Sequence, residues 1–202
     1  MLLHAIAYEE LLCAARAAGG DVAQFLRDEL PHNWRDSYFE MADRESEIVV
    51  YTNGSFDYIF DSYQQSHPYV PGAEKLPVEA RLVAAIGASM PTTKKRDDAR
   101  LRGLNFFPMQ TARSEWDRGH FIGHAIGGTV DGNEANVFPQ LRTINRGKYR
   151  VFEDYCRKKP GVLCFSRPIY DDTTAIPVAV DFGVLRTDGS LWVETLSNRR
   201  DA

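Results

Sequence analysis

Residues 117–153 read DRGHFIGHAIGGTVDGNEANVFPQLRTINRGKYRVFE, and this stretch is the most informative part of the chain about fold and function. It combines histidines, side-chain amides, carboxylates and arginines, residue types that bind ions or transfer protons. A helix is expected from about Pro139 to Lys159, because proline is favoured near a helix start and Pro160-Gly161 ends the pattern. The polar residues therefore lie before this predicted helix and within its first part.

Segments on both sides of this helix have the composition of β-strands. EIVVYT and SFDYIFD flank Asn53-Gly54, a two-residue hairpin signal, and residues 78–88 fit a strand or a short helix. Three further strands are expected toward the end of the chain, in GVLCFSRPIY, IPVAVDFGVLR and SLWVETL. A loop is expected at residues 66–77, and residues 94–102 are expected to form a charged connector or an exposed edge. The predicted class is α+β with an antiparallel sheet.

The first 46 residues predict an acidic helical extension. A helix over residues 2–18 would end at Gly19-Gly20, and a second helix, capped by Asp21, would run through Leu30 and end at Pro31. We place the domain boundary after this extension, with residues 1–46 before it and the main domain over residues 47–202. Two roles stay open for the extension, packing and the docking or masking of a basic partner such as the rest of the chain.

The formal net charge of −4 is unevenly distributed along the chain. Residues 1–80 hold 5 Lys or Arg and 14 Asp or Glu, whereas residues 81–202 hold 19 and 14. Residues 94–159 alone hold 14 and 8, so the basic excess coincides with the polar segment. This distribution is compatible with a phosphate-bearing ligand, but on charge alone a plain solvated surface is the favoured interpretation, and the charge decides neither fold nor function. With 44% hydrophobic residues the chain is neither disordered nor collagen-like.

Cysteine count and the amino-terminal sequence indicate the compartment. Three cysteines exclude a disulfide framework, so free thiols are expected. The amino-terminal apolar run has no basic region before it and is interrupted by Glu9 and Glu10, so no secretory signal peptide is predicted. No apolar stretch is long enough for a membrane span.

Hydrolysis of a phosphodiester needs a base that deprotonates water, a cation near the leaving oxygen, and donors that hold the phosphate. His120 is the candidate base, because histidine titrates near neutral pH. Asn145 offers a neutral oxygen to Mg²⁺. Glu153 lies eight residues further on, about 80° around and about 12 Å along an ideal helix, so contact through metal-bound water is favoured over direct ligation.

The order and spacing of these residues resemble the DNA/RNA non-specific endonucleases of the ββα-metal (His-Me finger) superfamily, particularly the branch found as bacterial toxin domains. The similarity is carried by Asp117-Arg118-Gly119-His120, by Asn136-Val137-Phe138-Pro139-Gln140, by Asn145-Arg146-Gly147 and by Glu153. It runs with decreasing strength from about residue 78 to residue 192.

The resemblance implies a ββα-metal finger core and a role for each matched residue. His120 resembles the general base, Asn145 the direct ligand of one Mg²⁺, for which Mn²⁺ would substitute, and Glu153 the residue that holds metal-bound water. Arg118 resembles a donor to the scissile phosphate, and Asn136 and Gln140 resemble amides that shape the site. No second phosphate-binding arginine is matched, and the open candidates are Arg102, Arg113, Arg142, Arg146 and Arg150.

The predicted activity is a Mg²⁺-dependent endonuclease of low sequence preference that leaves 5′-phosphate products. DNA is the expected substrate, and RNA stays an open second one. One alternative is a catalytically silent nucleic-acid-binding module of the same fold. Another is a structural zinc site built from His120, His124, Cys156 and Cys164.

A nuclease without a signal peptide would damage the cell that makes it unless it is restrained. The sequence therefore predicts a bacterial toxin or defence effector with an immunity or inhibitory protein as partner. We expect it in the cytoplasm of the producing cell, or delivered into target cells by a route that needs no signal peptide.

Overall fold

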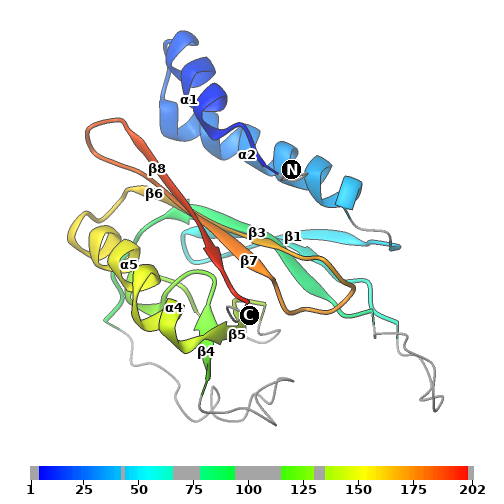
Figure 1. Ribbon diagram of the computed structural model, residues 1–202. Helices are drawn as coiled ribbons and strands as arrows, with labels where there is room; N and C mark the ends of the chain where they lie inside the picture. The colour runs from blue at the N-terminus through cyan, green and yellow to red at the C-terminus, as the bar shows by residue number, and fades with distance from the viewer. Residues whose placement is uncertain (1–4, 42–43, 66–77, 94–114, 130–134, 200–202) are drawn as a thin grey trace, which may run out of the picture.

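The computed structural model describes residues 5–41, 44–65, 78–93, 115–129 and 135–199. The elements are α1 (Tyr8–Ala17), α2 (Val22–Met41), β1 (Ile48–Asn53), β2 (Phe56–Asp61), β3 (Arg81–Ala88), β4 (Trp116–His120), η1 (His124–Ile126), β5 (Val137–Leu141), α4 (Arg142–Arg146), α5 (Lys148–Lys158), β6 (Leu163–Ile169), β7 (Ala179–Leu185) and β8 (Leu191–Ser197). Helices α1 and α2 cover one face of a sheet, and α4, α5 and the β4–β5 pair lie on the other (Figure 1).

Six strands form one antiparallel sheet in the order β1-β2-β3-β6-β7-β8, and β4 and β5 form a separate antiparallel pair. This arrangement confirms the predicted α+β class. Residues 78–88 hold the strand β3 rather than a short helix, and the three strands predicted toward the end of the chain are β6, β7 and β8. The loop predicted at 66–77 and the charged segment at 94–102 lie outside the described residues.

The first hairpin forms where it was expected, with its turn shifted by one residue. Asn53 pairs with Phe56 across β1 and β2, so Gly54 and Ser55 are the two turn residues. Gly54 has a φ of 64°, in the left-handed region that glycine adopts at little cost.

The prediction that a helix starts near Pro139 is wrong. Residues Val137–Leu141 form β5, with Pro139 opposite Arg118 of β4, and the helical region begins only at Arg142. A two-stranded pair leaves each strand one free edge, so the missing N–H of proline is tolerated there. The helix also breaks at Gly147, which separates α4 from α5.

The prediction that Pro31 ends the second helix is also wrong. Asp21 does cap α2, its Oδ1 accepting from the backbone N–H groups of Ala23 at 2.8 Å and Gln24 at 3.2 Å. The helix then continues through Pro31 to Met41. A buried stripe spaced every four residues crosses the proline, and its packing against the sheet outweighs the lost backbone hydrogen bond. The stripe consists of Leu26, Leu30, Trp34 and Tyr38.

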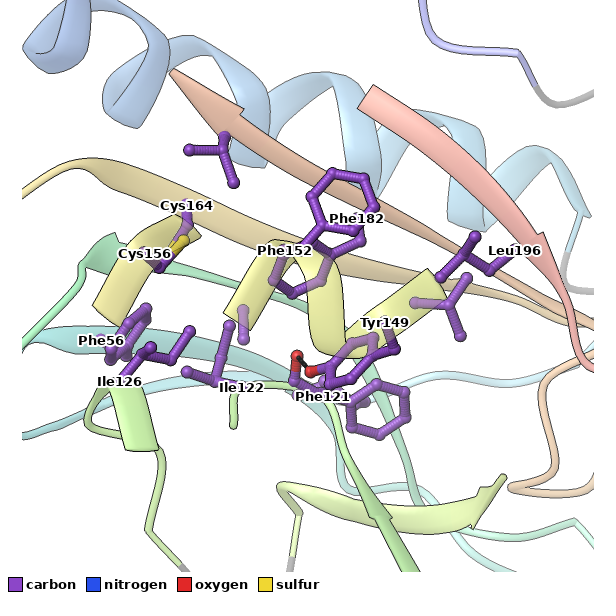
Figure 2. Packing of buried hydrophobic residues seen from close by; sticks show 14 of the residues in the cluster. Phe56, Phe121, Ile122, Ile126, Tyr149, Phe152, Cys156, Cys164, Phe182 and Leu196 are labelled. Atoms are coloured by element: carbon purple, nitrogen blue, oxygen red, sulfur yellow. Dashed lines mark hydrogen bonds between the residues drawn. The ribbon is translucent and has the colours of Figure 1, made fainter. Parts of the chain in front are cut away.

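Each face of the sheet has its own hydrophobic core. On one face Leu26, Leu30 and Trp34 of α2 pack against Ile86 and Phe165 of the sheet. On the other face α5 and the segments around β4 and β5 pack against β7 and β8, as Figure 2 shows. The residues labelled there from this second core include Phe121, Tyr149, Phe152, Phe182 and Leu196. The sheet therefore separates the helical pair from the polar segment.

A buried carboxylate links the helical pair to the sheet. Asp181 of β7 accepts hydrogen bonds from the Tyr8 hydroxyl at 2.9 Å and from Arg167 Nη1 at 2.9 Å, and Trp34 Nε1 donates to the same tyrosine oxygen at 3.3 Å. Both charged side chains are almost fully buried. The contacts fit the packing role for α1 and α2, and they give no support to masking of the opposite face. The boundary at residue 46 stays a prediction.

Cysteine side chains follow the expected pattern of free thiols. Cys13 is exposed on α1, whereas Cys156 of α5 and Cys164 of β6 are buried in the hydrophobic core. Within the described ranges, no helix is long and apolar enough to cross a membrane.

Candidate active site

Strand β4 carries the first group of predicted site residues. His120 ends the strand and is 6% exposed, and Arg118 is half-buried two residues before it. Tyr149 of α5 holds the end of this strand, because its buried hydroxyl lies 2.5 Å from the carbonyl oxygen of His120 and 2.6 Å from that of Phe121. Burial raises the pKa of Tyr149 well above its usual value, so the hydroxyl keeps its single proton, and the two carbonyl oxygens share it as acceptors.

Asn136 fixes the turn that follows His120. Its Oδ1 accepts from the backbone N–H of Ile122 at 2.8 Å, and its Nδ2 donates to the carbonyl oxygens of Ile122 at 2.9 Å and Thr129 at 3.2 Å. The side chain is 3% exposed. These contacts are those of an amide that shapes the backbone around the site.

Gln140 packs against a glycine of the neighbouring strand. A Cβ atom at Gly119 would overlap the Gln140 side chain, so the strand pair needs glycine here for the glutamine to lie flat against it. Gln140 is 2% exposed. It thus fills the space beside His120 and Arg118 on β4.

Asp117 gathers three donors from helix α4. Its carboxylate accepts from Arg142 Nε at 3.2 Å, from Asn145 Nδ2 at 3.1 Å, and from Arg146 through Nε at 2.9 Å and Nη2 at 3.1 Å. Partial burial alone would raise the pKa of the Asp117 carboxyl, but hydrogen bonds from Arg146, Asn145 and Arg142 outweigh it and hold the pKa below its usual range. The carboxylate is therefore ionised at neutral pH.

This ionised carboxylate determines which way the Asn145 amide is turned. An ionised carboxylate only accepts hydrogen bonds, so the Asn145 atom that faces it must be the NH₂ group. The amide oxygen is consequently directed away from Asp117. Asn145 presents a neutral oxygen whose orientation is fixed by a neighbouring strand.

Glu153 lies on the second turn of α5, against the segment that follows His120. A Cβ atom at Gly123 would overlap the Glu153 carboxylate, which shows how closely the side chain approaches this backbone. Gly123 is the residue immediately before η1. The glycine therefore makes room for a carboxylate at this position.

Asn145 and Glu153 line one open cavity of about 410 Å³. The other described residues around it are mainly charged, and they are Ala125, Arg146, Arg150, Asp154 and Arg157. The structure thus brings the predicted metal ligand and the predicted water-holding carboxylate to one cavity. His120 at the end of β4, Gln140 of β5 and Asn136 just before β5 are buried, and they are not among the described residues that line this cavity.

The candidates for the second phosphate-binding arginine differ in their surroundings. Arg142 and Arg146 are bound to Asp117, and of these Arg146 also lines the cavity together with Arg150. Arg102 and Arg113 lie outside the described residues. Arg157, which sequence reasoning did not single out, lines the cavity one turn beyond Glu153.

The zinc alternative is not supported by the arrangement of its residues. Cys156 and Cys164 are buried within the hydrophobic core, and a hydrogen bond from the Cys164 thiol to Cys156, together with burial, raises the pKa of Cys164. His120 ends β4 and His124 begins η1. In the part of the chain that the structure describes, no three His, Cys, Asp or Glu side chains are grouped so as to hold a metal ion.

Oxygen donors at the cavity suit a hard divalent cation. The Asn145 amide oxygen and the Glu153 carboxylate are ligands of the kind that Mg²⁺ and Mn²⁺ take, whereas zinc favours nitrogen and sulfur. The site therefore fits the metal expected from the spacing of these residues.

Sequence comparison identifies the family. A family model described as DNA/RNA non-specific endonuclease matches residues 77–182, which is more than half of the chain. The chain belongs to this family. As a DNA/RNA non-specific endonuclease it is a nucleic-acid hydrolase, and the matched range contains Asp117, His120, Asn145 and Glu153.

Two individual proteins are similar to this endonuclease over part of its length. The probable deoxyribonuclease RhsA of Dickeya dadantii (strain 3937) is 57% identical over 37 residues, which are 18% of this chain and 2% of that protein. The chain thus covers a very small part of this relative. The structure of Sda1 nuclease with a bound zinc ion aligns at 24% identity with a TM-score of 0.35, over 42% of this chain and 38% of that one.

Proposed function

We propose that this endonuclease hydrolyses phosphodiester bonds of DNA with the help of Mg²⁺ held at the cavity between α4 and α5. The observation that carries the proposal is the fixed amide of Asn145, which the ionised Asp117 turns so that its oxygen is left to bind a cation. Glu153 lines the same cavity and would hold the ion through water. When bound, Mg²⁺ supplies positive charge next to the leaving oxygen.

In this mechanism the residues of the chain divide the remaining work. His120 accepts a proton from the attacking water at one nitrogen of its imidazole ring, and its buried strand end keeps the ring in place. Arg118 donates to the scissile phosphate, and Arg146 and Arg150 supply further positive charge at the cavity. Contacts of this type read the phosphate backbone and not the bases, which accounts for low sequence preference.

The decisive experiment compares plasmid degradation in Mg²⁺, in EDTA and by two histidine variants. His120→Ala is expected to abolish cleavage, whereas His32→Ala changes an exposed histidine of α2 on the opposite face and is expected to be fully active. Full cleavage by His120→Ala, or full cleavage in EDTA, would overturn the mechanism. Binding of the plasmid without cleavage across several divalent metals would favour the catalytically silent alternative.

Products and substrate class follow from the same assay. Breaking the bond to the 3′-oxygen leaves a 5′-phosphate, so the fragments should accept a kinase label only after treatment with phosphatase. Matched DNA and RNA oligonucleotides of one sequence then decide whether RNA is a second substrate.

We further propose that the protein is a toxin or defence effector that an immunity protein restrains. Hydrolysis without sequence preference damages any cell that contains the free enzyme. The 57% identity to the probable deoxyribonuclease RhsA over 37 residues supports DNA as the target of that damage. The proposed site of action is the cytoplasm of a target cell, reached by a non-classical delivery route. Growth arrest on expression of the chain, absent with His120→Ala, is expected, and normal growth with active enzyme present would contradict the proposal.

A further inference from the structure

Asn198, the residue that follows β8, joins the six-stranded sheet to the β4–β5 pair. Its Oδ1 accepts from the backbone N–H of Leu141 at 2.9 Å, and its Nδ2 donates to the carbonyl oxygens of Pro139 at 3.0 Å and Pro177 at 2.9 Å. Its own backbone N–H donates to the Val178 carbonyl oxygen at 2.7 Å. The side chain is 3% exposed.

A side-chain amide matches these three partners. An amide offers one acceptor and two donors, and the site presents one N–H group and two carbonyl oxygens. Aspartate would place its negative charge against the two carbonyl oxygens. A small apolar residue would leave all three buried backbone groups without this partner, which is costly in a dry environment.

The two anchored residues of β5 lie next to the proposed catalytic groups. Leu141 immediately precedes α4, the helix that carries Asn145 four residues later. Pro139 is the register partner of Arg118, and the same strand pair ends at His120 opposite Val137. Asn198 thus holds β5, the strand that leads into the helix with the proposed metal ligand and pairs with the strand that carries the proposed base.

We propose that Asn198 is a positioning residue for the active site, a role that rests on the proposed function. Residues 77–182, the range matched by the endonuclease family, do not include Asn198. Its side chain ties the Asn145 helix and the Arg118–His120 strand to the large sheet in one geometry. A loosened junction would displace the metal ligand and the base relative to each other, and catalysis is sensitive to displacements of about 1 Å.

The test uses Asn198→Asp and Asn198→Ser in the full chain. Serine keeps one donor and adds no charge, so it remains informative if the aspartate variant does not fold. Thr195→Val is the matched control, because it removes one hydrogen bond to Asp181 from the same strand β8 without touching β5. Thermal unfolding, kcat, KM and Mn²⁺ binding are measured for each, the last by electron paramagnetic resonance of the unbound ion.

Both Asn198 variants are expected to lose about 10- to 100-fold in kcat and to bind Mn²⁺ more weakly at temperatures where they are fully folded. The threonine variant should keep wild-type kcat and Mn²⁺ affinity whatever its unfolding temperature. Folded Asn198 variants with unchanged kcat and unchanged Mn²⁺ affinity would overturn the inference. Absence of cleavage by the wild-type chain would instead refute the proposed function, and Mn²⁺ binding, measured without substrate, would still decide the role of Asn198.

Discussion

Asp117 Oδ2 accepts a hydrogen bond of 3.1 Å from Asn145 Nδ2, joining the strand that ends in the proposed base to the helix that carries the proposed metal ligand. The bond fixes the direction of the amide as well as its position. Asp117, which is not itself a proposed ligand, thus determines which atom of Asn145 is left to bind the proposed cation.

Asp117→Asn tests this relationship. The new amide can donate as well as accept, so it no longer selects the orientation of Asn145, and it removes the negative partner of Arg142 and Arg146. We expect a loss of about 10- to 100-fold in Mg²⁺ affinity or kcat. Asp57→Asn is the control, because Asp57 is also held by an arginine, Arg27, on the face that α2 covers. Similar losses from both variants would contradict a specific role for Asp117.

Acid should remove the stabilising contribution of Asp117. Its pKa in the folded chain lies below the value near 3.9 of an unfolded aspartate, so the folded state binds fewer protons in that range. The contribution is fully present above the unfolded pKa and is lost as the pH falls through the folded pKa. The difference in unfolding free energy between wild type and Asp117→Asn should therefore shrink from pH 6 toward pH 3 in denaturant titrations. A constant difference over this range would show that Asp117 is not held ionised.

Gly123→Ala should damage the site by steric conflict. The added methyl group would overlap the Glu153 carboxylate, which must then move away from the backbone beside His120. We expect cleavage to fall to a level similar to that of Glu153→Gln. Gly20→Ala is the matched control, because a Cβ atom there meets open space. Full activity of Gly123→Ala would mean that the observed place of Glu153 is not the active one.

Trp34→Ala should affect stability and leave the chemistry intact. Trp34 is fully buried between α2 and the sheet, so its truncation is expected to lower the free energy of unfolding by about 3–5 kcal/mol. The kcat of the folded fraction should be unchanged, because the proposed active site lies on the opposite face.

Deletion of residues 1–46 should unfold the chain, because it removes the helices that complete this core, and circular dichroism measures the loss of structure. A folded, more active deletion product would restore the masking hypothesis.

Local patterns predicted most of the strands, because the alternation of β-branched and aromatic residues can be recognised within a short run of consecutive residues. They failed at Pro31 and Pro139, where tertiary packing and a free strand edge decide whether proline is tolerated. The chemistry of His120, Asn145 and Glu153 was suggested by their spacing, and their catalytic roles stay predictions. Asp117 belongs to the same motif, but no sequence pattern predicted that it accepts a hydrogen bond from Asn145.

Asn198 could not be found from the sequence at all. Its partner Leu141 lies 57 residues away, and neither the composition around it nor its spacing marks a contact. Such a residue is recognised only when folding brings the end of the last strand to the end of β5. Tyr149 was missed for the same reason, since its hydroxyl reaches the end of β4 across 29 residues.

Because α1 and α2 lie across the sheet from the proposed active site, the enzyme can be labelled or immobilised through the helical pair. Cys13 is the one exposed thiol among its three cysteines, all of which the structure describes, and it lies on α1 across the sheet from the cavity. A maleimide dye or a surface linker should therefore react there selectively. Single-molecule recordings of an immobilised nuclease would then leave the path of the nucleic acid unobstructed.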